Sequence, residues 1–92
     1  MKLITVEAAF PPDQTRKAVD AVAAQADSVR AMEGCTQYAV YRSDNAIAIV
    51  QKWTSMEAFD QYRGSAVFAG LIGTLKPLMT APPVTTIADA VT

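Results

Sequence analysis

Residues 35–54 have the sequence CTQYAVYRSDNAIAIVQKWT, and the prediction of the fold starts from these residues. Its two halves, 35–43 and 46–54, are rich in the β-branched and aromatic residues that favour strands. Asp44 and Asn45 lie between them, and both residue types tolerate the left-handed backbone conformation that a two-residue hairpin turn requires. The stretch therefore predicts an antiparallel β-hairpin.

The turn also sets the register of the hairpin. With Ser43 opposite Ala46, the side chains that share one face are Thr36, Tyr38, Val40, Ile47, Ile49, Gln51 and Trp53. This pairing puts Thr36 opposite Trp53. The other face carries Cys35, Gln37, Ala39, Tyr41, Ala48, Val50 and Lys52. A slip of one residue would break this grouping.

The segment before the hairpin predicts a strand and a helix. Residues 2–10 alternate with a period of two until two prolines stop the strand, because proline cannot donate to a ladder. Asp13 is a suitable N-cap for a helix over about 13–31. The apolar stripe of this helix is Ala18, Val22, Ala26 and Val29. Gly34 follows it and can adopt a positive φ.

The segment after the hairpin predicts two helices and a last strand. Thr54 and Glu57 have the spacing of a capping box, and Gly64 ends the short helix that they begin. Ser65 can cap a further helix, whose apolar stripe is Phe68, Leu71, Ile72 and Leu75 and which ends or kinks at Pro77. Residues 84–88 alternate as a strand.

The predicted order is β-α-β-β-α(α)-β, which is the ferredoxin-like arrangement of an α+β protein with a four-stranded antiparallel sheet. We expect one domain over residues 1–92, since the length allows no second one. Helices would cover one face of the sheet, and a second copy of the chain is the simplest cover for the other. We therefore expect a homodimer, a dimeric α/β barrel, through the outer face that carries Cys35, Ala39, Tyr41 and Val50.

Composition excludes several classes of function. The 8 basic and 9 acidic residues give a net charge of −1 without a basic cluster, which argues against nucleic-acid binding. No apolar run is long enough to span a membrane, and the start of the chain does not resemble a signal peptide. The single cysteine cannot form an internal disulfide, which fits a cytoplasmic location. The chain has no histidine, so His-based nucleophilic catalysis and His-ligated haem are excluded, and no metal site is expected.

The second half resembles the antibiotic biosynthesis monooxygenase (ABM) family, which includes small quinol monooxygenases. The matching residues are Glu33-Gly34-Cys35-x-x-Tyr38, Gln51-Lys52-Trp53-Thr54-Ser55-x-Glu57-Ala58, Tyr62-x-x-Ser65-x-x-Phe68 and Leu75-x-Pro77-Leu78. The chain departs from the family pattern at three positions. Gln51 stands where the family has glutamate, Tyr62 where it has histidine, and Glu33 where a proline usually precedes the glycine.

The resemblance implies a homodimer with a pocket in each subunit between sheet and helices. It also implies oxygenation of a phenolic or quinol-like aromatic by O₂ without metal, flavin or haem, so that no cofactor is expected. The candidate catalytic residues are Trp53, Tyr38 and Tyr62. The candidate substrate-binding residues are Gln51, Ile49, Phe68 and Arg63.

Each candidate also has a purely structural interpretation. Trp53 can be a packing anchor, or it can aim its indole N–H at a substrate oxygen. Tyr38 can be a half-buried strand tyrosine, a hydrogen-bond donor to a phenolate or, with a lowered pKa, a base. Gln51 can bond Tyr38 or a helix end, or it can orient a substrate. Tyr62 can pack on the core or donate to an oxyanion, and Arg63 can be a solvated surface residue.

Two further functions stay open beside the monooxygenase. The chain can be a non-catalytic dimeric module that binds a small aromatic molecule, since both titratable family residues are replaced. It can also be a cofactor-free isomerase or lyase that acts on a small metabolite. Oxygen uptake, binding without turnover and product formation under nitrogen would distinguish the three.

Overall fold

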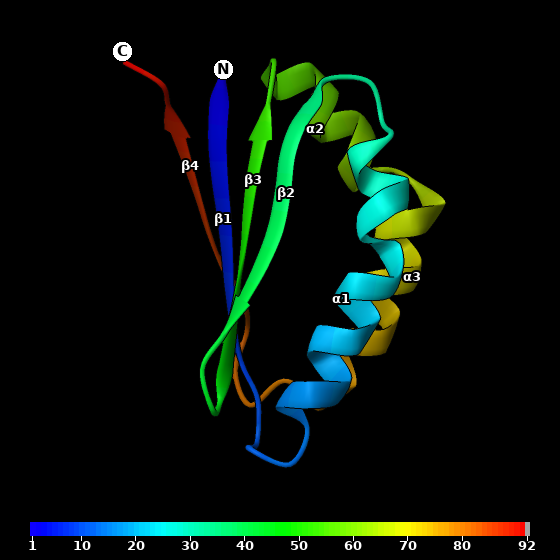
Figure 1. Ribbon diagram of the computed structural model, residues 1–92, viewed down its shortest axis with the longest axis vertical. Coiled ribbons are helices and arrows are strands. Elements are labelled where there is room, and N and C mark those ends of the chain that lie inside the picture. The colour runs from blue at the N-terminus through cyan, green and yellow to red at the C-terminus, as the bar shows by residue number, and fades with distance from the viewer. Residues whose placement is uncertain (92) are drawn as a thin grey trace.

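The computed structural model describes residues 1–91 and confirms the predicted α+β, ferredoxin-like order. Along the chain the elements are β1 (Lys2–Ala9), α1 (Thr15–Arg30), β2 (Cys35–Arg42), β3 (Ala46–Trp53), α2 (Met56–Arg63), α3 (Ala66–Leu75), the short 3₁₀ helix η1 (Lys76–Leu78) and β4 (Val84–Asp89). The four strands form one antiparallel sheet in the order β2-β3-β1-β4. Figure 1 shows the sheet as one layer and the helices as the other.

The core lies between the sheet and the helices. The predicted stripe of α1 is buried, and so are Ile4 and Ala8 of β1 and Phe10 just after it. β3 contributes Ile47, Ile49, Gln51 and Trp53. α3 adds Leu71 and Leu75. The period-two and helical patterns therefore predicted correctly which side of β3 and of α1 is buried.

The predicted hairpin register is confirmed except at its open end. Tyr38 pairs with Gln51 and Arg42 with Ile47, as expected. A bulge between Cys35 and Gln37 then shifts the start of β2, so that Cys35 and not Thr36 lies opposite Trp53. The placement of these two side chains was therefore wrong. Cys35 packs against the core, and Thr36 is exposed, because the extra residue reverses the alternation at that point.

The hairpin turn closes without the expected left-handed conformation, since no non-glycine residue among positions 1–91 has a positive φ. The Ser43 N–H donates to the Ala46 carbonyl at 2.9 Å, as the predicted pairing requires. The two turn carbonyls are then held from outside the hairpin. Phe10 N–H donates to Asn45 O at 2.8 Å, and Thr15 Oγ1 donates to Asp44 O at 2.9 Å. Contacts with the β1–α1 connection thus take over the role that we assigned to the turn residues themselves.

Two predicted helix caps are displaced by one residue. α1 begins at Thr15 after Gln14, which makes no side-chain cap, so Asp13 is not the N-cap. Ser55 and not Thr54 caps α2, and its Oγ accepts from Ala58 N–H at 3.2 Å. Ser65 caps α3 in the same way, as predicted.

Gly34 adopts the predicted positive φ, at 88°. Its carbonyl also accepts a hydrogen bond from Thr54 N–H at 2.8 Å, which ties the α1–β2 connection to the end of β3. A Cβ at this position would lie 2.5 Å from Ala58 Cβ and 2.9 Å from Thr54 Oγ1. Only glycine fits here without distortion.

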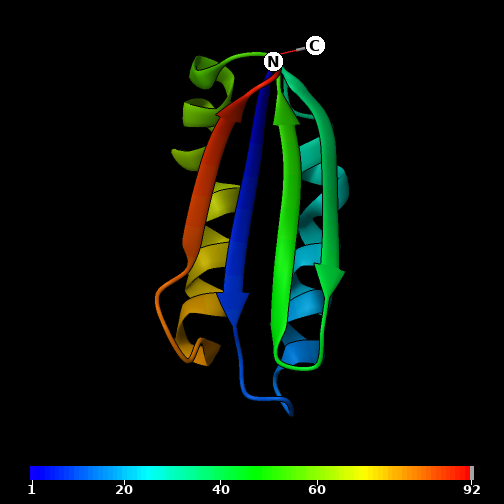
Figure 2. The same ribbon diagram turned by 90° about the vertical axis from the view of Figure 1, so that its left-hand side faces the viewer.

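The outer face of the sheet is uncovered, as Figure 2 shows. Leu3, Tyr41 and Val84 are 36%, 60% and 61% exposed, and all residues of β4 are exposed. Among residues 1–91, no helix has the length and apolar character of a membrane span.

Candidate functional site

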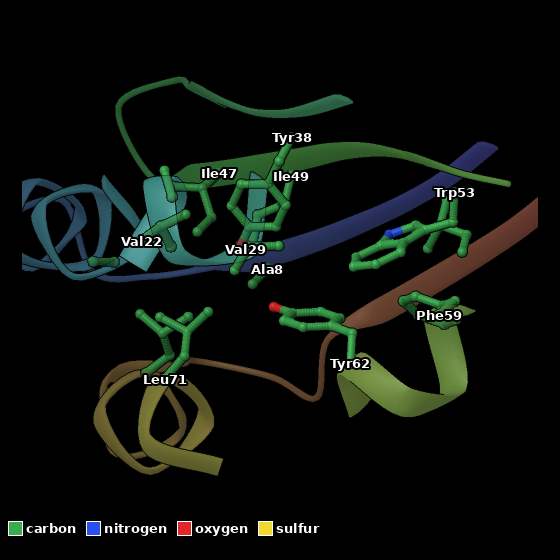
Figure 3. Close-up of a cluster of buried hydrophobic side chains, with 14 of the residues drawn as sticks. Ala8, Val22, Val29, Tyr38, Ile47, Ile49, Trp53, Phe59, Tyr62 and Leu71 are labelled. Atoms are coloured by element: carbon green, nitrogen blue, oxygen red, sulfur yellow. The ribbon is translucent and has the colours of Figure 1, made fainter. Parts of the chain in front are cut away.

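Five aromatic side chains gather between the sheet and the helices at the end where β3 finishes, and we call them the aromatic cluster. Figure 3 labels all of them except Phe68. They are Tyr38 on β2, Trp53 on β3, Phe59 and Tyr62 on α2, and Phe68 on α3. Tyr62 is at the centre. Its ring stacks on the Trp53 indole with centroids 5.3 Å apart and meets Phe68 edge-on at 5.3 Å. Tyr38 approaches Tyr62 edge-on at 6.3 Å.

The Trp53 indole is fully buried, and its N–H is already engaged. Nε1 donates to Gln51 Oε1 at 3.0 Å, and both side chains are almost entirely shielded from solvent. Of the two interpretations of Trp53, this contact fits the packing anchor, because the N–H is directed at Gln51. The predicted partners of Gln51 were wrong, because its oxygen accepts from Trp53 and not from Tyr38 or a helix end. The pair fixes the plane of the indole against β3.

The hydroxyl of Tyr38 is the one buried side-chain polar atom among residues 1–91 that lacks a hydrogen-bond partner. Burial raises the pKa of Tyr38 well above its ordinary value, and the nearby Tyr62 hydroxyl raises that pKa further. The lowered pKa that a catalytic base would need is therefore contradicted. Tyr38 therefore keeps its proton at neutral pH, so its hydroxyl can donate a hydrogen bond but cannot act as a base.

Tyr62 contributes the second hydroxyl of the cluster. Its side chain is buried, and Figure 3 shows its hydroxyl directed into the interior between α3 and the sheet. Burial raises the pKa of Tyr62 as well, while the neighbouring Tyr38 hydroxyl opposes that shift. The residue that stands at the family's histidine position is thus a neutral donor and not a proton acceptor at neutral pH.

The predicted substrate-binding residues separate into two groups. Ile49 is buried on the inner face of β3, and Phe68 is half-buried against Tyr62, so both belong to the interior. Arg63 does not. Its guanidinium is partly exposed, forms an ion pair with Asp60 and lies 4.7 Å from the centroid of the Phe59 ring. The structure therefore assigns Arg63 to the surface interpretation, since these contacts hold it on the outer side of α2.

The three best-defined surface hollows of residues 1–91 are not lined by Tyr38, Trp53 or Tyr62. The largest, about 580 Å³, lies at the opposite end of the molecule, between the end of α3 and the 79–83 connection. The aromatic cluster is packed shut in this structure. Tyr38, Trp53 and Tyr62 are each at most 2% exposed, so a ligand could contact their rings only after neighbouring side chains move.

The sequence matches one known protein family. Residues 1–72 match the family described as antibiotic biosynthesis monooxygenase, which covers most of the chain. The chain belongs to this family. No curated protein matches it in sequence.

Solved structures share the fold at low sequence identity. Rv0793 from Mycobacterium tuberculosis is 22% identical with a TM-score of 0.91, over 99% of this chain and 95% of that one. A candidate antibiotic biosynthesis monooxygenase from Nitrosomonas europaea is 14% identical with a TM-score of 0.94, over the whole of both chains. A similar candidate from Deinococcus radiodurans is 17% identical with a TM-score of 0.89, over 98% of this chain and 92% of that one.

Within this ABM domain, sequence reasoning missed Arg30 as a residue that contacts the site. Its guanidinium donates two hydrogen bonds to the main-chain carbonyl of Tyr38, from Nε at 3.0 Å and from Nη2 at 2.8 Å. The available signal was a basic residue in the last turn of α1, which is common at helix ends and points to no particular strand. Phe59 of α2 also belongs to the cluster, since its ring lies 6.1 Å from the Trp53 indole and 6.2 Å from the Tyr62 ring, centroid to centroid.

The chemistry that the ABM site can perform follows from these groups. It offers two neutral phenols as donors, a rigid indole wall and an apolar surround, without an imidazole or a buried carboxylate. Among residues 1–91, no three Cys, Asp or Glu side chains come together as a set that could hold a metal ion. Such a site can stabilise an anion that arrives already deprotonated, but it cannot accept the proton itself.

Proposed function

We propose that this chain is a monooxygenase that oxidises an electron-rich phenol or hydroquinone with O₂ and without a bound cofactor. The observation that carries the proposal is the buried, unpartnered Tyr38 hydroxyl beside Tyr62 in an aromatic interior. A buried donor without an acceptor costs stability, about 1–3 kcal/mol, and natural proteins retain such groups where function uses them. Membership of the ABM family supports oxygenation as that use.

In the proposed reaction, the substrate itself supplies the electrons. A phenolate passes one electron to O₂, and the two radicals combine. One oxygen atom ends in the product as a carbonyl, the second leaves as water, and the substrate loses two hydrogens. Tyr38 and Tyr62 would donate to the phenolate oxygen, and the Trp53 indole would be one wall of the site. The protein's contribution is to favour the anion and to exclude water.

The two raised tyrosine pKa values shape the expected pH dependence. Because neither hydroxyl gives up its proton near neutral pH, the substrate has to lose its own proton before or on binding. We therefore expect kcat/KM to rise with pH and to level off at the pKa of the substrate. Two hydroquinones of different acidity should show two different midpoints.

The proposal includes a homodimer through the uncovered sheet face. Leu3, Tyr41 and Val84 lie exposed on that face, and the helices lie on the opposite one. A second copy would bury these side chains. Sedimentation equilibrium at micromolar concentration tests this part, and a monomeric mass would contradict it.

The test of function is oxygen uptake by EDTA-treated protein with a panel of hydroquinones, naphthoquinols and anthrones. We expect uptake above the autoxidation blank that Trp53→Phe and Tyr38→Phe reduce, since each removes a group in contact with the proposed substrate site. Lys17→Ala, on the exposed side of α1, is the matched control and should match the wild type. Saturable quenching of Trp53 fluorescence without uptake would instead indicate a binding module. Product formation under nitrogen would indicate an isomerase or lyase.

A further inference from the structure

Tyr38 lies on an edge strand of the sheet. β2 is at one edge of the order β2-β3-β1-β4, so only β3 pairs with it. The bulge between Cys35 and Gln37 interrupts that pairing immediately before Tyr38. An edge strand that follows a bulge is held less firmly than a central strand. The backbone that carries the unpartnered hydroxyl therefore needs another support.

Arg30 supplies that support from the last turn of α1. Its Nε and Nη2 donate to the same Tyr38 carbonyl at 3.0 and 2.8 Å, and its Nη1 lies 3.2 Å from Asp27 Oδ1. The guanidinium thus bridges one acidic side chain on the helix and one carbonyl on the strand. A planar guanidinium can use three of its nitrogens in this way, whereas a lysine ammonium presents a single point of attachment.

We propose that Arg30 is a positioning residue for Tyr38. We call the two hydrogen bonds from Arg30 to the Tyr38 carbonyl the Arg30 fork. The fork takes the place of a neighbouring strand at this edge and fixes the backbone of Tyr38. It thereby fixes the position of the Tyr38 hydroxyl relative to Tyr62. Val29, fully buried beside Arg30, anchors this end of the helix in the core, so the fork is attached to a rigid element. The catalytic consequence rests on the function proposed above, but the positioning itself does not.

A double-mutant cycle tests whether Arg30 acts through the Tyr38 hydroxyl. We expect Arg30→Ala to lower kcat for the best hydroquinone by about tenfold with KM nearly unchanged, less than the roughly 100-fold loss when a donor itself is removed. In a Tyr38→Phe background the same substitution should change kcat by less than about twofold, because no hydroxyl remains to be positioned. Equal effects in both backgrounds would overturn the proposal.

Two companion variants separate positioning from general damage. Arg30→Lys keeps the charge and one donor, and it should recover part of the lost kcat. Arg16→Ala removes an exposed arginine from the same helix and should match the wild type. Added guanidinium ion should partly rescue Arg30→Ala, since the Arg30 side chain is half exposed and its site can be reached from solvent. Failure of both rescues would contradict a role for the fork.

A second readout needs no turnover, so it distinguishes failure of this inference from failure of the proposed function. In protein labelled with ¹³Cζ-tyrosine, Arg30→Ala should shift or broaden the Tyr38 resonance and leave the exposed Tyr41 resonance in place. Tyr38→Phe assigns the signal. An unchanged Tyr38 resonance would overturn the positioning role even in an active enzyme. A shifted resonance in a protein without oxygen uptake would support positioning and contradict the monooxygenase.

Discussion

Two buried hydroxyls at opposite ends of the molecule differ in their hydrogen bonding. Thr15, at the start of α1, donates to Asp44 O at 2.9 Å and lies 3.3 Å from Pro11 O, so its hydroxyl holds the hairpin turn. Tyr38, in the aromatic cluster, has no partner for its hydroxyl. Both side chains are almost completely buried. The fold satisfies the polar group that it needs for structure, and leaves one unsatisfied where the proposed substrate would bind.

The largest expected effect in the aromatic end is that of Trp53→Ala. It should lower the free energy of unfolding by about 3–5 kcal/mol, because it leaves a large cavity and removes the hydrogen-bond donor of the buried Gln51 side chain. Ile47→Val, in the aliphatic part of the same strand, should cost only about 0.5–1.5 kcal/mol. Urea denaturation followed by circular dichroism measures both. Similar losses for the two variants would remove the energetic distinction between the two parts of the core.

Gly34→Ala should cost about 2–4 kcal/mol. The new methyl group would overlap Ala58 and Thr54, and alanine would also have to adopt a left-handed φ. Gly73→Ala is the matched control, since the same methyl group meets nothing within 4 Å. Thermal unfolding of the two variants should place Gly34→Ala far below the wild type and Gly73→Ala at or above it. A neutral Gly34→Ala would mean that the Gly34–Thr54 connection does not support the aromatic end.

Gln51→Leu should destabilise the protein by about 1–3 kcal/mol. The substitution keeps similar volume but removes the acceptor of the Trp53 N–H, which stays buried. The double variant Gln51→Leu/Trp53→Phe should recover part of the loss, because it removes the donor as well. Chemical denaturation of the two single variants and the double variant gives the coupling energy. A coupling near zero would contradict the hydrogen bond as a source of stability.

Removing the two contrasted hydroxyls should have effects of opposite sign. Thr15→Val should cost about 1 kcal/mol, since its hydroxyl is bonded, whereas Tyr38→Phe should be neutral or stabilising by up to about 1 kcal/mol. Oxygen uptake should follow the reverse pattern, with Thr15→Val active and Tyr38→Phe impaired. A clear destabilisation by Tyr38→Phe would mean that its hydroxyl has a partner in solution.

The smallest effect should appear at alkaline pH. Burial raises the folded-state pKa of Tyr38 above the unfolded value of about 10, so its contribution to stability is fully present below about pH 10 and is lost as pH rises above that. The free energy of unfolding of the wild type should then fall more steeply with pH than that of Tyr38→Phe. The difference should stay below about 1 kcal/mol over the first half unit above pH 10. Parallel pH curves would contradict the raised pKa.

Much of this fold could be predicted because each element has its own local signal. The hairpin residues, the α1 stripe and Gly34 all depend on periodicity or on backbone preference within a few positions. The β2 bulge could not be predicted, since simple alternation assumes one residue per position on each strand. The N-cap of α1 was misplaced for a similar reason. Asp13 and Gln14 are adjacent, and residue preference alone does not show which of them precedes the first helical residue.

The candidate site was less predictable because it depends on how elements meet. The sequence placed Tyr38, Gln51 and Trp53 on one face, and the Gln51–Trp53 bond could have been inferred, since residues i and i+2 of a strand point the same way. The fork from Arg30 could not, because it depends on where the end of α1 lies over β2. In the sequence Arg63 is chemically equivalent to Arg30. Only the contacts of Arg63 with Asp60 and Phe59 show that it has a different role from Arg30.

The position of β1 has a consequence for synthesis of the chain. β1 is made first, yet both of its neighbours in the sheet come later, β3 ending at residue 53 and β4 at residue 89. At about 5–20 residues per second, the ribosome takes several seconds to deliver the second neighbour. During that interval β1 has an open edge that another nascent chain could pair with. Newly made copies should therefore be most prone to aggregate just before β4 leaves the exit tunnel.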